Sequence, residues 1–278
     1  MLDIKSAGEH VKDAHGFHLP FGYHVELPRF VFDLPVLGHV EFQLTKFMVL
    51  EVVAAVLMIL IFIPLAFRLR GGKPPRGKLA NFFEAVLLYF RDQVARPAIG
   101  SHHADRFLPF LWTTFFFLLF CNLLGAVPWA GSATAALSVT AAMALITFLV
   151  VIGSGMAEFG ITGFWLGLVP KMDLPPLLAV FLKPMLWGIE VAGLLIKHAV
   201  LAVRLMANMF AGHLVLAVIL GFIAAIPLRM FLLWFGVTVF SIGLQVALNM
   251  LELFVAFLQA YIFTFLAALF IGMAVHQH

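Results

Sequence analysis

Long apolar runs separated by short polar breaks fill most of the chain after residue 45. About 20 apolar residues are enough for a helix to cross the hydrocarbon core of a bilayer. The pattern predicts membrane-spanning helices at about 47–67, 107–127, 133–153, 177–226 and 230–275. The tripeptide "GSG" at 153–155 is interpreted as the turn that ends the third span. We therefore expect an all-α polytopic membrane protein with five crossings.

The last two runs are much longer than a bilayer is thick. Residues 177–226 would extend about 75 Å as a helix, whereas the hydrocarbon core measures about 30 Å. Each run is therefore either two ordinary spans with a concealed turn or one long helix. Polar turn residues are missing near both midpoints, which favours a hairpin of two long, strongly tilted helices. Pro184 and several glycines permit bends.

Residues 79–96 have a different pattern. Apolar residues recur there at helical spacing, while Glu84, Arg91 and Asp92 interrupt any spanning run. This spacing predicts an amphipathic helix that lies in the membrane interface. The loop before it, at 68–78, contains five cations and no acid. Because short cation-rich loops stay on the cytoplasmic side, we expect the interfacial helix inside and the N-terminus outside.

Composition agrees with this membrane class. The chain has 278 residues, of which 63% are hydrophobic and 11% charged, whereas soluble domains carry about 25% charged residues. The few basic residues lie mostly in loops, so nucleic-acid binding is not expected. We expect residues 1–45 to form a polar tail on the outside face and residues 46–278 to form one transmembrane domain.

Polar residues recur every seven positions in the long hairpin. Seven residues at about 100° each return to nearly the same side of a helix, with a drift of about 20°. Glu190, Lys197 and Arg204 therefore share one stripe on the first helix. A similar stripe on the second helix consists of Gln245, Glu252 and Gln259. Such alignment along two lipid-embedded helices predicts a polar path through the membrane.

One antiparallel register brings Arg204 to the depth of Gln259 and His213 to the depth of Glu252. Carboxylates and histidines exchange protons near neutral pH when the site tunes their pKa values, whereas arginine keeps its charge. A permanent cation between Glu190 and the His213 side is a barrier to ions and attracts a carboxylate. On position alone, Arg204 is as well explained by a structural role, binding carbonyls inside a bundle.

Four motifs decide between these interpretations. "RLMANMFAGHLVLAVI" and "LELFVAFLQAYIFTFL" closely resemble two helices of subunit a of F-type ATP synthases. "FCNLLGAVP" and "SATAALSVTAAMA" resemble the same family, and the resemblance covers most of residues 80–275. In that family, subunit a is the stator beside a rotating ring of c subunits. Two offset half-channels lead protons to and from the carboxylates of the ring.

The resemblance also implies roles for individual residues. Arg204 matches the essential arginine, and Gln259 matches its neighbour on the last helix. His213 and Glu252 match the outer half-channel, and Glu190 matches the inner one. In some bacterial relatives the acid of the outer pair precedes the histidine, and here the order is reversed. The complete set of implied proton-translocation residues is Arg204, Glu190, Asn208, His213, Glu252 and Gln259.

The resemblance further implies partners and a location. The expected partners are the c-ring, the b subunits of the peripheral stalk and the lipid bilayer, and the expected location is the inner membrane of a bacterium. We expect no cofactor, no metal and no catalytic centre within this chain, and the "SHHAD" segment at 101–105 is expected to be a solvated loop. The alternatives are a stand-alone proton or cation channel or transporter, and an intramembrane enzyme.

Overall fold

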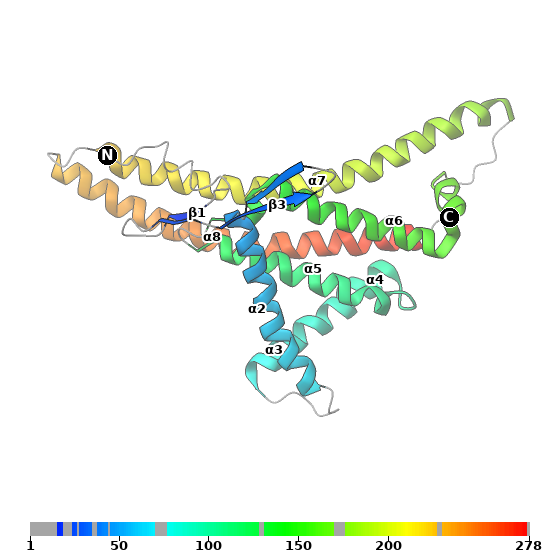
Figure 1. Cartoon of the computed structure of the whole chain (residues 1–278), viewed down its shortest axis with the longest axis horizontal. Coiled ribbons are helices and arrows are strands. Elements are labelled where there is room, and N and C mark those ends of the chain that lie inside the picture. Colours follow the sequence, from blue (N-terminus) through cyan, green and yellow to red (C-terminus); the bar gives the residue numbers. More distant parts are fainter. Residues whose placement is uncertain are drawn as a thin grey trace. The chain divides into compact units, whose positions relative to one another are not determined.

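The computed structural model describes residues 16–18, 24–26, 28–34, 38–43, 45–69, 77–127, 131–169, 176–226 and 230–276. Five helices in this part of the chain are long and apolar enough to cross a membrane. They are α2 (Lys46–Leu69), α5 (Ala104–Gly125), α6 (Leu137–Gly167), α7 (Pro176–Ala225) and α8 (Phe231–Val275) (Figure 1). The expected helical, polytopic membrane protein with five crossings is confirmed.

The two longest helices settle the question of concealed turns. Helix α7 has 50 residues and α8 has 45, and both continue through their midpoints. Pro184 lies inside α7 without ending it. Each C-terminal run is therefore one long helix, as the missing turn residues indicate. The tilt of these helices in a bilayer stays a prediction.

Helix α6 corrects one expectation. The segment Gly153 to Gly155 was expected to be a turn that ends the third span, and this is wrong because α6 continues to Gly167. A Cβ at Gly155 would overlap the ring of Phe164 and lie 3.2 Å from the carbonyl oxygen of Ala274. Glycine is therefore needed at residue 155 for close packing. The backbone leaves helical geometry only at Gly160, where φ is 74°.

The predicted interfacial helix is present in three consecutive pieces. Helix α3 (Lys78–Tyr89) continues into the π-helix η1 (Phe90–Ala95) and then into α4 (Arg96–Ile99). The wider π turn was not expected from the sequence, and π segments inside α-helices are frequent at functional sites. The position of these helices in the membrane interface remains a prediction.

The N-terminal tail contains short strands that the sequence analysis did not predict. Strand β1 (Gly16–His18) pairs antiparallel with β2 (His24–Glu26). Strand β3 (Arg29–Leu34) pairs antiparallel with β4 (Gly38–Gln43), with Arg29 opposite Gln43 and Leu34 opposite Gly38. Aromatic and β-branched residues recur in β3 and β4, and such residues favour strands.

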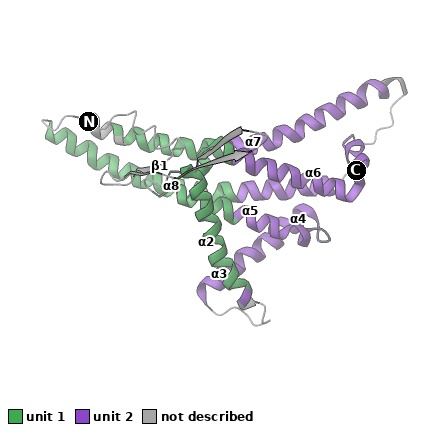
Figure 2. Ribbon diagram, viewed as in Figure 1, with its two compact units in different colours: residues 1–66, 116–139, 205–260 green, residues 67–115, 140–204, 261–278 purple. Residues whose placement is uncertain are grey.

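The chain divides into two compact units (Figure 2). Unit 1 consists of residues 1–66, 116–139 and 205–260, and unit 2 consists of residues 67–115, 140–204 and 261–278. A short η2 turn (Ala133–Ala135) belongs to unit 1 and precedes α6. Large buried side chains fill each unit: Leu118, Leu205 and Met209 in unit 1, and Phe90, Phe115, Phe164 and Phe263 in unit 2.

Candidate functional site

In unit 1, the carboxylate of Glu252 on α8 lies against Gly212 on α7. A Cβ at Gly212 would lie 2.9 Å from Oε1 and 3.2 Å from Cδ of Glu252, so the absence of a side chain leaves room for the carboxylate. Met209 and Ala256, about one turn away, pack in one buried cluster. Both contacts define an antiparallel register within unit 1. This register places Glu252 beside the residue that precedes His213, at the level expected from the sequence.

Glu252 and His213 each carry a buried atom without a partner. Oε1 of Glu252 and Nε2 of His213 form no hydrogen bond with any residue in the described part of the chain. A buried donor or acceptor without a partner costs about 1–3 kcal/mol. The histidine on α7 and the glutamate on α8 therefore each carry an unpaired atom at nearly the same level of the hairpin. The two side chains are not hydrogen-bonded to each other.

Lys46 is a charged neighbour that the sequence analysis did not single out. It is the first residue of α2, only 3% of its surface is exposed, and its ammonium group interacts electrostatically with the imidazole of His213. Both residues belong to unit 1. The signal in the sequence that could have identified it is a lysine at the very start of an apolar span. Unit 1 therefore contains the ammonium group of Lys46 and the titratable side chains of His213 and Glu252.

A buried chain of hydrogen bonds lies one turn along α8 from Glu252. Asn122 of α5 donates through Nδ2 to the carbonyl oxygen of Ala256, with a distance of 3.1 Å. Thr134 of η2 donates to Oδ1 of Asn122 over 2.8 Å, and its hydroxyl lies 3.0 Å from that of Ser132. This chain ties α5 and η2 to α8. The sequence analysis quoted the two motifs that contain these residues but did not predict their contacts.

Arg204 has a very different environment. Its side chain is exposed, and it forms no hydrogen bond or ion pair with the residues described. Its neighbours Val200 and Val203 are 47% and 49% exposed. An arginine at the centre of a bilayer costs about 3 kcal/mol on insertion scales. A cation on such an apolar surface therefore favours a partner from outside the described chain over a structural role.

The remaining candidates lie on the same two helices. Glu190 is exposed on α7 and belongs, with Arg204, to unit 2. The two residues are separated by about 21 Å along the helix axis. Asn208 on α7 and Gln259 on α8 are half-buried and belong to unit 1. The structure thus divides the candidates between the two units, and within unit 1 it places Glu252 against Gly212, the residue before His213.

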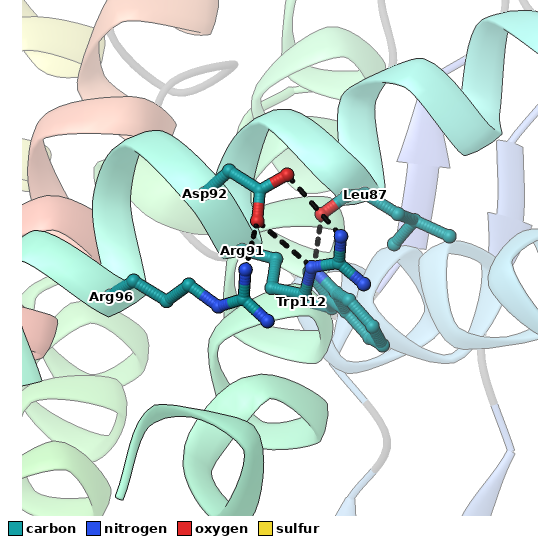
Figure 3. Close-up of polar contacts among 5 residues, drawn as sticks. All are labelled: Leu87, Arg91, Asp92, Arg96 and Trp112. Carbon is teal, nitrogen blue, oxygen red and sulfur yellow. Dashed lines mark hydrogen bonds and ion pairs between the residues drawn. The ribbon is translucent and has the colours of Figure 1, made fainter. Parts of the chain in front are cut away.

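Three charged residues form a network on the predicted interfacial helix (Figure 3). Arg91 donates through Nε and Nη2 to the two carboxylate oxygens of Asp92, over 3.0 and 3.3 Å, and Arg96 donates to Oδ1 over 2.9 Å. The hydrogen bond from Arg91 lowers the pKa of Asp92 below its ordinary value. Beside this network, Trp112 donates through Nε1 to the carbonyl oxygen of Leu87 over 3.2 Å. This hydrogen bond links α5 to the last turn of α3, directly before the π segment.

No group of three or more His, Cys, Asp or Glu side chains is placed to hold a metal ion within the described ranges. The histidines near the 101–105 turn make ring contacts. The ring centroids of His102 and His103 are 5.0 Å apart, and those of His103 and His276 are 6.0 Å apart. The described residues of this region therefore offer aromatic packing in place of a three-ligand site.

Five apolar helices and unpaired titratable groups inside a long hairpin define a polytopic membrane protein of the ion-translocating class. The family model described as ATP synthase A chain matches residues 48–272, and the chain belongs to this family. This confirms the family inferred from the four motifs.

Curated relatives agree over nearly the whole chain. ATP synthase subunit a of Chloroherpeton thalassium is 39% identical over 270 residues, which cover 96% of this chain and 75% of the relative. The subunit a of Myxococcus xanthus is 38% identical over 278 residues, or 97% of this chain and 88% of the relative. The subunit a of Anaeromyxobacter sp. strain Fw109-5 is 40% identical over 275 residues, which cover 97% of this chain and 62% of the relative.

Proposed function

We propose that this chain is the stator subunit of a rotary F-type ATP synthase in a bacterial inner membrane. It provides two offset half-channels that lead protons to and from the carboxylates of a c-ring, and it also contacts the b subunits of the peripheral stalk. ATP chemistry takes place in other subunits, and this chain contributes no catalytic centre. The observation that carries the proposal is the exposed Arg204, which has no partner among the described residues.

Arg204 acts as the charge that separates the two half-channels. A carboxylate of the ring must lose its proton to one half-channel before it passes the stator, and must regain a proton from the other. A bare carboxylate in a low-dielectric environment is costly, and a nearby cation offsets this cost. Arg204 favours the ionised carboxylate as each c subunit passes. Its permanent charge also repels protons that would otherwise run directly between the half-channels.

The outer half-channel uses His213 and Glu252. Nε2 of His213 and Oε1 of Glu252 are buried and have no hydrogen-bond partner among the described residues, so neither atom is already engaged in a hydrogen bond there. The buried Lys46 belongs to the same unit as this pair. Gly212 supports this arrangement because it leaves space for the carboxylate of Glu252. Proton transfer between water and this pair is the chemistry that the outer half-channel requires.

The inner half-channel leads past Glu190 to the other side of the membrane. Glu190 is exposed and forms no ion pair with the part of the chain that the structure describes. Asn208 and Gln259 have polar amides without a charge, so they do not compete with Arg204 for the carboxylate of the ring. Their role is to hydrate and orient the groups that carry charge.

The test is the substitution Arg204→Ala in the assembled complex. We expect ATP-driven acidification of membrane vesicles to fall by at least about 100-fold, because the preorganised charge that stabilises the ring carboxylate is lost. Passive proton leak through the membrane sector should persist or increase, since the blocking charge is gone. Arg96→Ala is the matched control, because this arginine has its partner on the same helical segment.

Two results would contradict the proposal. Near-normal coupled pumping by Arg204→Ala would show that its charge is not needed for translocation. Purification of the chain alone, with proton conductance but no c-ring or catalytic head, would instead identify the alternative, a stand-alone proton or cation channel or transporter.

A further inference from the structure

His198 is a buried titratable residue that the proposed mechanism does not use. It lies on α7 in unit 2 and is only 4% exposed. Its Nδ1 atom lies 2.8 Å from the carbonyl oxygen of Leu194. A carbonyl oxygen only accepts hydrogen bonds, so Nδ1 carries the hydrogen and Nε2 is left with a free lone pair. Nε2 is buried and has no hydrogen-bond partner among the residues described.

The surroundings of the imidazole are aromatic. Its ring centroid is 5.1 Å from that of Phe148 on α6 and 5.1 Å from that of Phe270 on α8. All three rings belong to unit 2. An apolar side chain of similar size would fill this slot without leaving a polar atom unpaired, whereas the histidine pays the full desolvation cost of Nε2. Packing alone therefore does not explain the imidazole.

The position of His198 along α7 suggests what the imidazole does. It lies about 12 Å from Glu190 and about 9 Å from Arg204 along the helix axis. Along the axis its level is therefore between the exposed carboxylate and the separating charge, on a buried side of the same helix. An imidazole whose Nδ1–H is held by a carbonyl can take up a proton at Nε2 and release it there, without a change of tautomer.

We propose that His198 is a further proton-carrying residue of the inner half-channel. The lone pair of Nε2 binds a proton delivered by water, and imidazolium forms. The new N–H bond then breaks and the proton returns to water on the side of Glu190, so the imidazole is neutral again after each transfer. This inference rests on the proposed function and adds a carrier between Arg204 and Glu190.

The first test compares His198→Phe with the unchanged protein in assembled complexes. Phenylalanine fills the aromatic slot but has no proton-binding atom. We expect passive proton conductance of vesicles stripped of the catalytic head to fall about tenfold, as for the loss of a proton-transfer group. Phe148→Leu is the matched control, because it changes packing in the same slot but leaves Nε2 in place. Its conductance should stay near that of the unchanged protein.

The second test asks whether water reaches the site. In a Cys121→Ser background, His198→Cys should react with a small water-soluble methanethiosulfonate reagent, and the reaction should block conductance. Leu201→Cys is the control, since Leu201 lies on the same helix and is 2% exposed, and it should stay unreactive. Thiol reactivity tests the proposal even if His198→Phe disturbs assembly. If the histidine had only a structural role, water would not reach the site and the cysteine at residue 198 would stay unreactive.

The outcomes separate the two proposals. Unchanged conductance in His198→Phe, or an unreactive thiol at residue 198, would overturn the role of His198 while Arg204→Ala still abolishes pumping. Normal pumping by Arg204→Ala would overturn the proposed function itself. Loss of conductance in His198→Phe together with thiol block at residue 198 supports the inference.

Discussion

Two arginine environments in the described part of the chain are opposites. On η1 and α4, Arg91 and Arg96 share the carboxylate of Asp92, which is at most four residues away (Figure 3). On α7, Arg204 is exposed among apolar neighbours and has no ion-pair partner in the described ranges. An arginine with a local structural role has its counter-charge nearby in the same chain. An arginine without one, on a membrane-spanning helix, indicates a counter-charge that arrives from another molecule.

The same contrast applies to the carboxylates. Asp92 accepts three hydrogen bonds from two arginines. Oε1 of Glu252 is buried beside Gly212 and accepts none from the described residues. A carboxylate that is held by cations keeps its charge over a wide pH range, whereas an unpaired one is suited to exchange its proton. Under the proposed function, the two environments separate groups that are held by local ion pairs from groups that exchange protons.

The largest difference is expected for arginine to lysine substitutions. Arg204→Lys should lower ATP-driven acidification by at least about 100-fold, because lysine is a compact, strongly hydrated charge that loses its proton more readily when buried. Arg91→Lys should keep most of the activity, since an ammonium group also pairs with Asp92. Acidification by vesicles with equal amounts of assembled complex measures both. Full activity of Arg204→Lys would mean that any cation serves at this position.

A smaller effect is expected for Gly212→Ala. The new Cβ would lie 2.9 Å from Oε1 of Glu252, and the flexible carboxylate can move away at little cost to folding. Because proton transfer depends on position, we expect pumping to fall about 3- to 10-fold while assembly is kept. Gly153→Ala is the control, as no atom lies within 4 Å of its Cβ position. An unchanged rate in Gly212→Ala would argue against a role for the position of this carboxylate.

A still smaller effect is expected for Asp92→Asn. The substitution removes the ion pairs of Arg91 and Arg96, but partly exposed ion pairs contribute little to stability. Pumping should change by less than about twofold. The same vesicle assay applies, with the amount of assembled complex as the control. A loss as large as that of Arg204→Lys would break the comparison, because the local network would then be essential for translocation.

The smallest effect is a pH dependence. The hydrogen bond from Arg91 lowers the pKa of Asp92 below its ordinary value of 3.8, so the folded state favours the ionised form. The resulting stability is present above this value and is lost as the pH falls through the lowered pKa. The difference in melting temperature between the unchanged protein and Asp92→Asn should therefore shrink at strongly acidic pH. A difference that grows on acidification would have the wrong sign.

Much of the architecture is predictable from the sequence because hydrophobicity and helical period are local properties. The apolar runs predicted five spanning helices, and the missing turn residues predicted that α7 and α8 are continuous. The end of α6 was not predicted, because two nearby glycines in a sequence suggest a turn. The structure shows that Gly155 instead makes room for the ring of Phe164. The π turn at η1 was also not predicted, and neither was the hydrogen bond beside it, from Trp112 of α5 to the carbonyl oxygen of Leu87 at the end of α3.

The sequence by itself determined the membrane class and the family motifs. It also singled out the candidate residues for proton translocation, because a charge in an apolar helix is costly. Only the tertiary structure decided which of these charges have partners. It left Oε1 of Glu252 and Nε2 of His213 without a hydrogen-bond partner among the described residues, and it placed His198 between two phenylalanine rings. The physical reason is that pairing and burial depend on contacts between residues far apart in the chain, which no local pattern contains.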